Sequence, residues 1–331
     1  MHSLQAIELV RGLCLPLMML EQLRHLWLAD LTHQPLGFFS ATAIFIFLSG
    51  YLAGLRMPAQ PLRRWFQLYT LHMSLSLVVI ALAGITLLGR EVEIAITDPW
   101  QALLDAALLM PRVPLLNFLP MYLVFLAATP FLLACFEADR EKQVFGVSFA
   151  VWLGAQSEIL PDLAGWQLLY VIAVYLGVTP VERPVRTKAL NLGLFGCLVA
   201  LAMLRHASWF GLEAFRESMP AWWVEQSSLG PMVLLNLALW VAFLWLVPEP
   251  LCRMARQGRL FIAMGHNAFA MLAWQVLLFY AFMSWFPQRS EFSMGGQALV
   301  VCFAVACLVF PVALAINAFL PEAPANHRSD S

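Results

Sequence analysis

Charge is scarce in this chain of 331 residues. Only 12% of the residues are charged, whereas 61% are hydrophobic, and the mean hydropathy is +0.77. Soluble domains carry about 25% charged residues, so the composition excludes a soluble globular protein and indicates a chain that crosses a membrane several times. The net charge of -1 offers no basic surface, and we expect no nucleic-acid partner.

Familiar catalytic motifs are also missing. The sequence contains no Walker motif, no GxGxxG, no GxSxG and no HExxH, so the phosphate, nucleophile and zinc sites that these motifs build are not expected. The six cysteines form no CxxC pair, and we interpret them as buried small hydrophobic residues. We therefore expect no bound cofactor and no metal.

Long apolar segments dominate what is present. A helical span needs about 20 apolar residues, and the chain offers about ten candidates with helical periodicity. They are Ile7–Leu28, Phe38–Leu55, Phe66–Leu88, Phe118–Phe136, Val144–Ile159, Leu163–Val181, Ala189–Leu204, Leu229–Val247, Asn267–Phe286 and Ala298–Leu320. The shorter stretch Trp100–Met110 is expected to be an interfacial or re-entrant helix. The first span lacks a small-residue cleavage site, so we expect it to be retained.

Basic residues follow every second span. The loops after spans two, four, six and eight hold Arg56, Arg63, Arg64, Arg140, Lys142, Arg183, Arg186, Lys188, Arg253, Arg256 and Arg259. Because Lys and Arg accumulate in cytoplasmic loops, both termini are predicted to face the cytoplasm. The sequence thus predicts an all-α integral membrane protein with a single bundle of about ten helices over residues 1–320. The polar segment 321–331 is predicted to be a disordered cytoplasmic tail.

The first span carries polar side chains at membrane depth. Glu8, Arg11, Gln22 and His25 follow steps of three and four along one helix face, together with Leu15 and Met18. Ionisable groups in a membrane are costly and mark functional sites that face the protein interior. Glu8 and Arg11, three residues apart, are expected to form an ion pair.

Three clusters carry a family resemblance. They are Glu8-Leu-Val-Arg11-Gly12, the block from Gly37 to Gly54, and Leu119-Pro120-Met-Tyr122, with supporting matches at Arg64, Tyr69, His72, Trp166, Gln167, Gly265-His266-Asn267 and Trp274-Gln275. In this order and spacing, from about Leu4 to Tyr280, the chain resembles the OpgC family of bacterial inner-membrane proteins, within the wider group of polytopic membrane O-acyltransferases.

The resemblance implies a reaction and its partners. It implies a multi-pass protein of the bacterial inner (cytoplasmic) membrane that transfers an acyl group, typically succinyl. The donor would be cytoplasmic acyl-CoA, such as succinyl-CoA, acting as a substrate and not as a bound cofactor. The acceptor would be a hydroxyl of an osmoregulated periplasmic glucan or a related glycan. The expected partners are therefore the lipid bilayer, acyl-CoA and the glycan, and the oligomeric state is left open.

The resemblance also assigns roles to residues. In the wider group an arginine and a histidine, eleven positions apart on the first helix, are the functional pair; Arg11 matches the arginine, but Gln22 stands at the histidine position. His25, nearly one turn further, is the candidate replacement base, and the alternative places it at the membrane interface. The predicted catalytic set is Arg11, Gln22 and His25, and the predicted substrate-binding set is Glu8, Arg64, Tyr69, His72, Trp166 and Gln167. For His72 and Trp166 a packing role is the alternative. For Arg64 the alternative is the charge bias of cytoplasmic loops, and for Glu8 and Arg11 it is a structural ion pair at the helix end.

Further departures leave two functions open. Ala43 and Asn117 stand where the family has acidic residues, and Gln275 stands where it often has histidine. The chain is therefore either an active O-acyltransferase or a catalytically degenerate relative that binds glycan or lipid, or partners an active enzyme. A transporter is disfavoured because matching halves with paired broken helices are not evident.

Overall fold

The computed structural model describes residues 2–22, 37–38, 40–56, 61–85, 98–110, 118–157, 159–179, 187–207, 211–225, 227–246, 249–285 and 294–314. Over these ranges the regular secondary structure is helical, which confirms the all-α prediction. His25, Asn117 and the tail 321–331 lie outside the described residues. The predictions for these residues stay predictions.

A helix overlaps each predicted span. In chain order they are α1 (His2–Gln22), α3 (Ala41–Leu55), α4 (Pro61–Ile85), α7 (Phe118–Glu137), α8 (Glu141–Gln156), α9 (Trp166–Val178), α10 (Lys188–Arg205), α14 (Pro231–Leu246), α17 (Ala268–Trp285) and α18 (Met294–Leu314). The shorter elements are α6 (Pro99–Ala107), η1 (Asp162–Gly165), α12 (Glu213–Glu217), α13 (Ala221–Val224), α15 (Glu249–Gln257) and α16 (Arg259–His266). The α6 helix coincides with the helix expected over Trp100–Met110.

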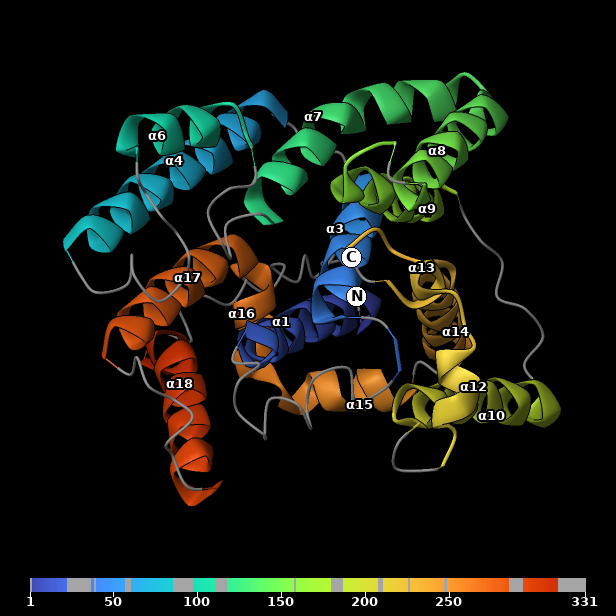
Figure 1. Ribbon diagram of the computed structural model, residues 1–331. Helices are drawn as coiled ribbons and strands as arrows, with labels where there is room; N and C mark the ends of the chain where they lie inside the picture. Colours follow the sequence, from blue (N-terminus) through green and yellow to red (C-terminus); the bar gives the residue numbers. More distant parts are fainter. Residues whose placement is uncertain are drawn as a thin grey trace, which may run out of the picture.

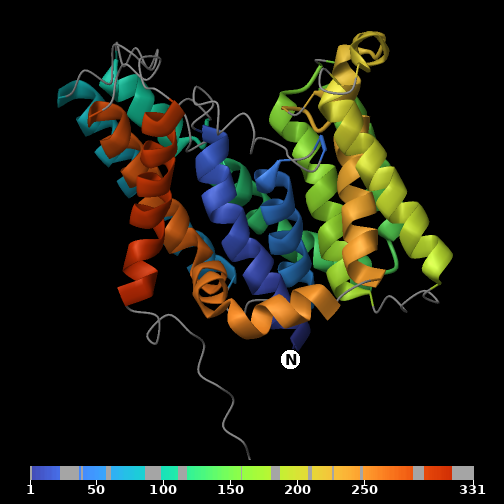
Figure 2. The same ribbon diagram turned by 90° about the horizontal axis from the view of Figure 1, so that it is seen from below.

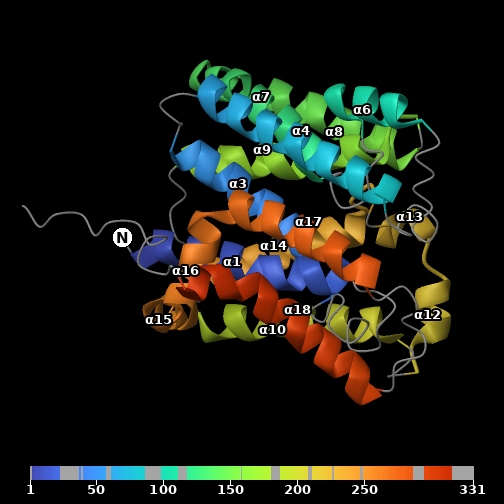
Figure 3. The same cartoon turned by 90° about the vertical axis from the view of Figure 1, so that its left-hand side faces the viewer.

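The long helices form a bundle whose two ends differ. They run side by side in roughly one direction (Figure 3), and α15 lies across the end at which the N-terminus is found (Figure 2). The short α12 lies at the opposite end (Figure 3). The body of the bundle is therefore made of long helices, and short helices lie at its ends.

The length and apolarity of a helix decide whether it can cross a bilayer. Among the described residues, the helix Phe118–Glu137 alone is long and apolar enough to cross one, and the pair Arg259–His266 and Ala268–Tyr280, bent by 91°, passes as one broken span. Five apolar helices are shorter: Ala41–Leu55, Trp166–Val178, Ala189–Arg205, Pro231–Leu246 and Ala298–Leu314. The topology of about ten spans with cytoplasmic termini stays a prediction.

Glycines bring α3 and α9 into backbone contact near the centre of the bundle (Figure 1). A Cβ atom added at Gly54 would overlap the carbonyl oxygen of Val174, and one added at Gly177 would overlap that of Tyr51. Gly50 faces Tyr170 in the same crossing. Gly50 and Gly54 permit this close packing, because only residues without a side chain let the two backbones approach this closely.

The ninth predicted span, Asn267–Phe286, agrees with α17 to one residue at each end, but a further helix precedes it. The chain is helical before Asn267, in α16, and turns by 91° into α17. The Asn267 side chain donates from Nδ2 to the carbonyl of Ala263 at 3.0 Å and so caps the end of α16. Gly265 of α16 packs on α1, since an added Cβ atom would overlap the carbonyl oxygen of Glu8.

The prediction that all six cysteines are buried is wrong in part. Cys14 is buried, and Cys135, Cys252 and Cys307 are partly buried. Cys197 on α10 and Cys302 on α18 are exposed on the outside of the bundle. In a chain this apolar, outward-facing positions accept small apolar side chains as readily as inward ones.

Candidate functional site

The predicted face of α1 points into the protein. Leu15 is 0% exposed, Met18 is 4% exposed and Arg11 is 5% exposed. This face, which we call the polar line, is therefore buried against neighbouring helices from Arg11 to Met18. Gln22 ends α1, and its side chain, like His25, lies outside the described part of the molecule.

The predicted ion pair at the start of this line is present. Arg11 Nη1 donates to Glu8 Oε2 at 3.0 Å, with side chains that are 6% and 19% exposed. The carboxylate partly balances a cation that is expensive to bury. Arg11 Nε is also buried, and it has no hydrogen-bond partner in the described structure. The guanidinium is therefore held in place by Glu8, while its Nε donor makes no hydrogen bond in the described structure.

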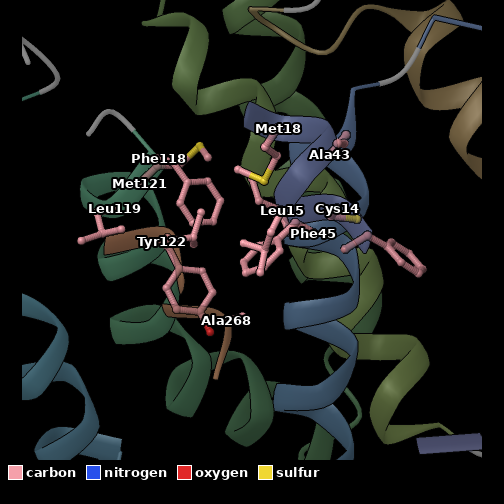
Figure 4. Close-up of a cluster of buried hydrophobic side chains, with 14 of the residues drawn as sticks. Cys14, Leu15, Met18, Ala43, Phe45, Phe118, Leu119, Met121, Tyr122 and Ala268 are labelled. Atoms are coloured by element: carbon pink, nitrogen blue, oxygen red, sulfur yellow. The ribbon is translucent and has the colours of Figure 1, made fainter. Parts of the chain in front are cut away.

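Four aromatic rings gather beside this guanidinium, and we call them the aromatic cluster: Phe45 on α3, Phe118 and Tyr122 on α7, and Phe269 on α17. The ring centroids of Phe45 and Phe118 are 5.3 Å apart, and those of Tyr122 and Phe269 are 4.7 Å apart. Phe118 and Tyr122 face Leu15 of α1 across the core (Figure 4). These spacings are those of favourable aromatic pairs.

Two arginines contact the aromatic cluster. The guanidinium carbon of Arg11 lies 5.3 Å from the Phe45 ring centroid, and that of Arg64 lies 6.0 Å from the Phe269 ring centroid. Each contact contributes roughly 0.5–2 kcal/mol. Arg11 is buried and Arg64 is exposed. The structure thus brings Glu8, Arg11 and Arg64 to one cluster, where guanidinium donors suit a carboxylate or phosphate group.

Tyr69 and His72 hold α6 against α4. Tyr69 Oη donates to the carbonyl of Ala107 at 3.0 Å, and His72 Nε2 lies 3.1 Å from the carbonyl oxygen of Ala106. Because a carbonyl only accepts, this Nε2 carries a proton. His72 Nδ1 is buried with no partner among the described residues. Both side chains therefore have a structural contact, and their predicted role in substrate binding stays a prediction.

Trp166 joins a set of donors around one turn, which we call the turn clamp. Trp166 Nε1 donates to the carbonyl of Ser227 at 2.7 Å, Gln156 Nε2 to that of Ser228 at 2.6 Å, and Trp152 Nε1 to that of Leu229 at 2.9 Å. The clamp fixes the segment just before α14.

Gln167, the neighbour of Trp166, has a similar contact. Its Nε2 donates to the carbonyl of Ser148 at 2.6 Å and ties α9 to α8. Both polar groups serve helix packing, and substrate binding by Trp166 and Gln167 stays a prediction.

Gln275 holds the backbone of α1, which sequence reasoning missed. In the amide orientation that satisfies both atoms, it donates to the carbonyl of Leu15 at 3.2 Å and accepts from the N–H of Met19 at 3.0 Å. Pro16 lies between these residues and lacks the N–H that would bond to the preceding turn. A proline inside a helix, combined with a polar residue on a distant apolar span, is the signal for such a contact.

Of the two remaining departures from the family pattern, Ala43 and Asn117, the structure describes Ala43. Ala43 is 0% exposed in the core, and its N–H donates to Ser40 Oγ at 3.2 Å. Glu21 Oε1 accepts from the N–H of Ala41 at 2.7 Å, so Glu21 and Ser40 together cap α3. Glu21 of α1 therefore has a capping contact with α3.

Comparison with known proteins identifies the family. The model of the OpgC protein family matches residues 4–319, which include Arg11, Arg64 and the aromatic cluster. Neither a curated protein nor a solved structure matches the chain. A match over nearly the whole length shows that this chain belongs to the OpgC protein family, a family of membrane-associated proteins that modify glucans.

Proposed function

We propose that this chain is a multi-pass O-acyltransferase of the bacterial inner membrane that acts on a periplasmic glucan or a related glycan. It would take a succinyl-type acyl group from cytoplasmic acyl-CoA. The sugar oxygen bonds to the thioester carbonyl carbon and the carbon–sulfur bond breaks. The hydroxyl proton passes to a base and from the base to the sulfur, so that CoA leaves as the thiol. The products are the acylated glycan and free CoA.

One observation supports this proposal most: two arginines contact the same aromatic cluster at different depths. Arg64 is exposed and lies near the start of α4, the end that the predicted topology places toward the cytoplasm. Arg11 is the tenth residue of α1 and is buried, about 14 Å along that helix. A donor that enters from the cytoplasm would meet Arg64 first and Arg11 deeper in the protein.

The two arginines then have separate roles. Arg64 binds a phosphate of CoA, which stays near solvent. Arg11 binds the developing oxyanion or the carboxylate of the acyl group inside the protein, where a charge-assisted hydrogen bond is strongest. The aromatic cluster excludes water, so that the thioester reacts with the sugar hydroxyl and not with solvent.

The base is the open part of the proposal. His25 is the nearest titratable residue on the predicted face, three residues after Gln22 in the sequence. We propose that His25 accepts the hydroxyl proton. If the His25→Ala variant kept full acyl transfer in a working assay, His25 would not be the base.

A second function is favoured by the departures from the family pattern. Gln22, Ala43 and Gln275 are all neutral, and Gln275 is engaged with the backbone of α1. A catalytically degenerate relative would keep the fold and Arg11, and would bind glycan or lipid, or partner an active enzyme. The experiment must therefore separate an active from an inactive site.

The gene is deleted from its host, and periplasmic glucans are analysed by mass spectrometry. We expect loss of acyl groups on deletion and recovery with wild type or with Arg140→Ala, which removes an exposed arginine. Arg11→Ala is expected to lower the acylation rate by about 100-fold or more. Arg11→Lys keeps the charge, and immunoblots confirm that each variant accumulates in the membrane.

Unchanged glucans after deletion would contradict the proposal. If acylation were then gained only with Gln22→His, the chain would be the degenerate relative.

A further inference from the structure

An apolar groove of about 520 Å³ separates α14 from α3 and α9. Its walls come from Phe47 on α3, Ile172 and Leu176 on α9, and Ala238 and Val241 on α14. The indole nitrogen of Trp245 is the polar atom that the side chains lining the groove contribute. This volume falls within the range of about 300–1,000 Å³ that small-molecule sites occupy.

The groove is unfavourable unless an apolar molecule fills it. Water gains too few hydrogen bonds between apolar walls to enter. An empty space leaves the wall atoms without partners and forfeits their dispersion contacts. On a helix bundle that a bilayer surrounds, the apolar molecule at hand is a lipid chain. Ala238 and Leu235 are exposed in the groove and are free to contact it.

One end of the groove carries an unused donor. Trp245 Nε1 is buried and has no hydrogen-bond partner in the part of the chain that the structure describes, while the ring packs edge-on against Tyr51 at 6.3 Å. A buried N–H without an acceptor is costly, so a lining of this kind favours a ligand that brings an acceptor. A fully saturated hydrocarbon has none, whereas the ester group of a phospholipid has carbonyl oxygens. Tryptophan is typical of this depth, where chains meet headgroups.

Positive charge follows at the same end. Trp245 is the penultimate residue of α14, and α15 begins three residues after α14 ends. The α15 helix lies across the bundle end (Figure 2), and it exposes Arg253 next to Met254, which is 50% exposed. A short helix with exposed basic and apolar side chains suits the interface of a membrane with anionic lipids.

We propose that the groove binds one acyl chain of an anionic phospholipid. The chain lies between α9 and α14, an ester carbonyl accepts the Trp245 Nε1 hydrogen, and the headgroup lies toward Arg253 of α15. The binding site does not depend on acyl transfer, and it would be present in an active enzyme and in a degenerate relative alike.

The test uses the full-length chain in phosphatidylcholine vesicles that contain phosphatidylglycerol with a diazirine on one acyl chain. After irradiation, the labelled residues are located by mass spectrometry. We expect labelling concentrated on α9 and α14. Ala238→Phe fills the groove and is expected to lower this labelling about tenfold, whereas Ala150→Phe, on the exposed face of α8, leaves it unchanged.

Two further variants test the polar contacts. Trp245→Phe keeps the ring and removes the donor, and we expect about fivefold less labelling of the groove. Arg253→Gln is expected to reduce the preference for phosphatidylglycerol over an equally labelled phosphatidylcholine. Size-exclusion chromatography confirms the fold of every variant.

Two results would overturn the proposal. Labelling spread evenly over the outward-facing helices would mean that lipid only surrounds the protein. Equal groove labelling in wild type, Ala238→Phe and Trp245→Phe would mean that the chain does not lie where we place it. Equal labelling by the two lipids in wild type would refute the role of Arg253.

Discussion

The α9 helix contacts its neighbours in two opposite ways. Toward α3, glycines on both helices bring the backbones together, so that an added Cβ atom at Gly54 or Gly177 has no space. Toward α14, which contains no glycine, larger apolar side chains line a groove of about 520 Å³. Small residues thus fix the distance between helices, whereas rows of leucine and valine leave room for another apolar molecule.

The α14 helix is attached by other means. The turn clamp holds the segment before it, and Asn236 Oδ1 accepts from the N–H of Phe38 at 3.0 Å. Trp245 packs against Tyr51 near its other end. A few polar contacts therefore position α14 across the groove from α9, while backbone packing positions α3 directly against α9.

The largest effect on stability is expected where α3 packs against α9. Gly54→Leu places a side chain where the carbonyl of Val174 lies, and we expect a loss of about 3 kcal/mol or more in stability, or no folded protein. Gly193→Leu is the matched control, because an added Cβ atom there meets no atom within 4 Å. Thermal unfolding in detergent measures the stability of both variants. A Gly54→Leu variant as stable as Gly193→Leu would remove the basis of the comparison.

An intermediate effect is expected at Asn236. Asn236→Leu leaves the N–H of Phe38 without its acceptor at a site that is 0% exposed, and we expect a loss of about 1–3 kcal/mol. The control is Asn191→Leu on α10, where the buried Oδ1 has no partner in the described structure. Urea unfolding of the two variants is compared. Similar losses in both would mean that the Phe38 contact does not hold α14.

The smallest effect is expected at the turn clamp. Trp166→Phe keeps the ring and removes one of the three donors, so we expect a loss of about 1 kcal/mol. Trp100→Phe, at a residue 80% exposed on α6, is the control. Acyl transfer is measured in the same samples. Reduced transfer at unchanged stability would show that Trp166 binds substrate. Reduced stability at unchanged transfer would show that it only packs.

Much of the fold was predictable because the length of an apolar run in the sequence indicates a helical span. A helix overlaps each predicted span, and the glycines of α3 mark a close crossing. The start of α17 was predicted to within one residue, but the role of Asn267 was not, because a polar residue at the edge of an apolar run looks the same whether it begins a helix or caps the preceding one. That choice depends on contacts of α16 with α1, which are distant in sequence.

The candidate site was predictable in its charges but not in its aromatic surroundings. A buried arginine in an apolar span is conspicuous, and Arg11 with Glu8 was expected from spacing alone. The aromatic cluster was not, since Phe45, Phe118, Tyr122 and Phe269 come from three helices in a chain with 24 phenylalanines. Phenylalanine is too common here for its positions to predict which rings meet.

Gln275 gives α1 an anchor that acidity does not alter. An amide neither gains nor loses a proton at physiological pH, so its bonds to Leu15 and Met19 are the same whichever side of a membrane sets the pH. A histidine in this position, as the family resemblance leads one to expect, would lose its acceptor on protonation near neutral pH. This contact of the first helix therefore does not change with the acidity around the cell.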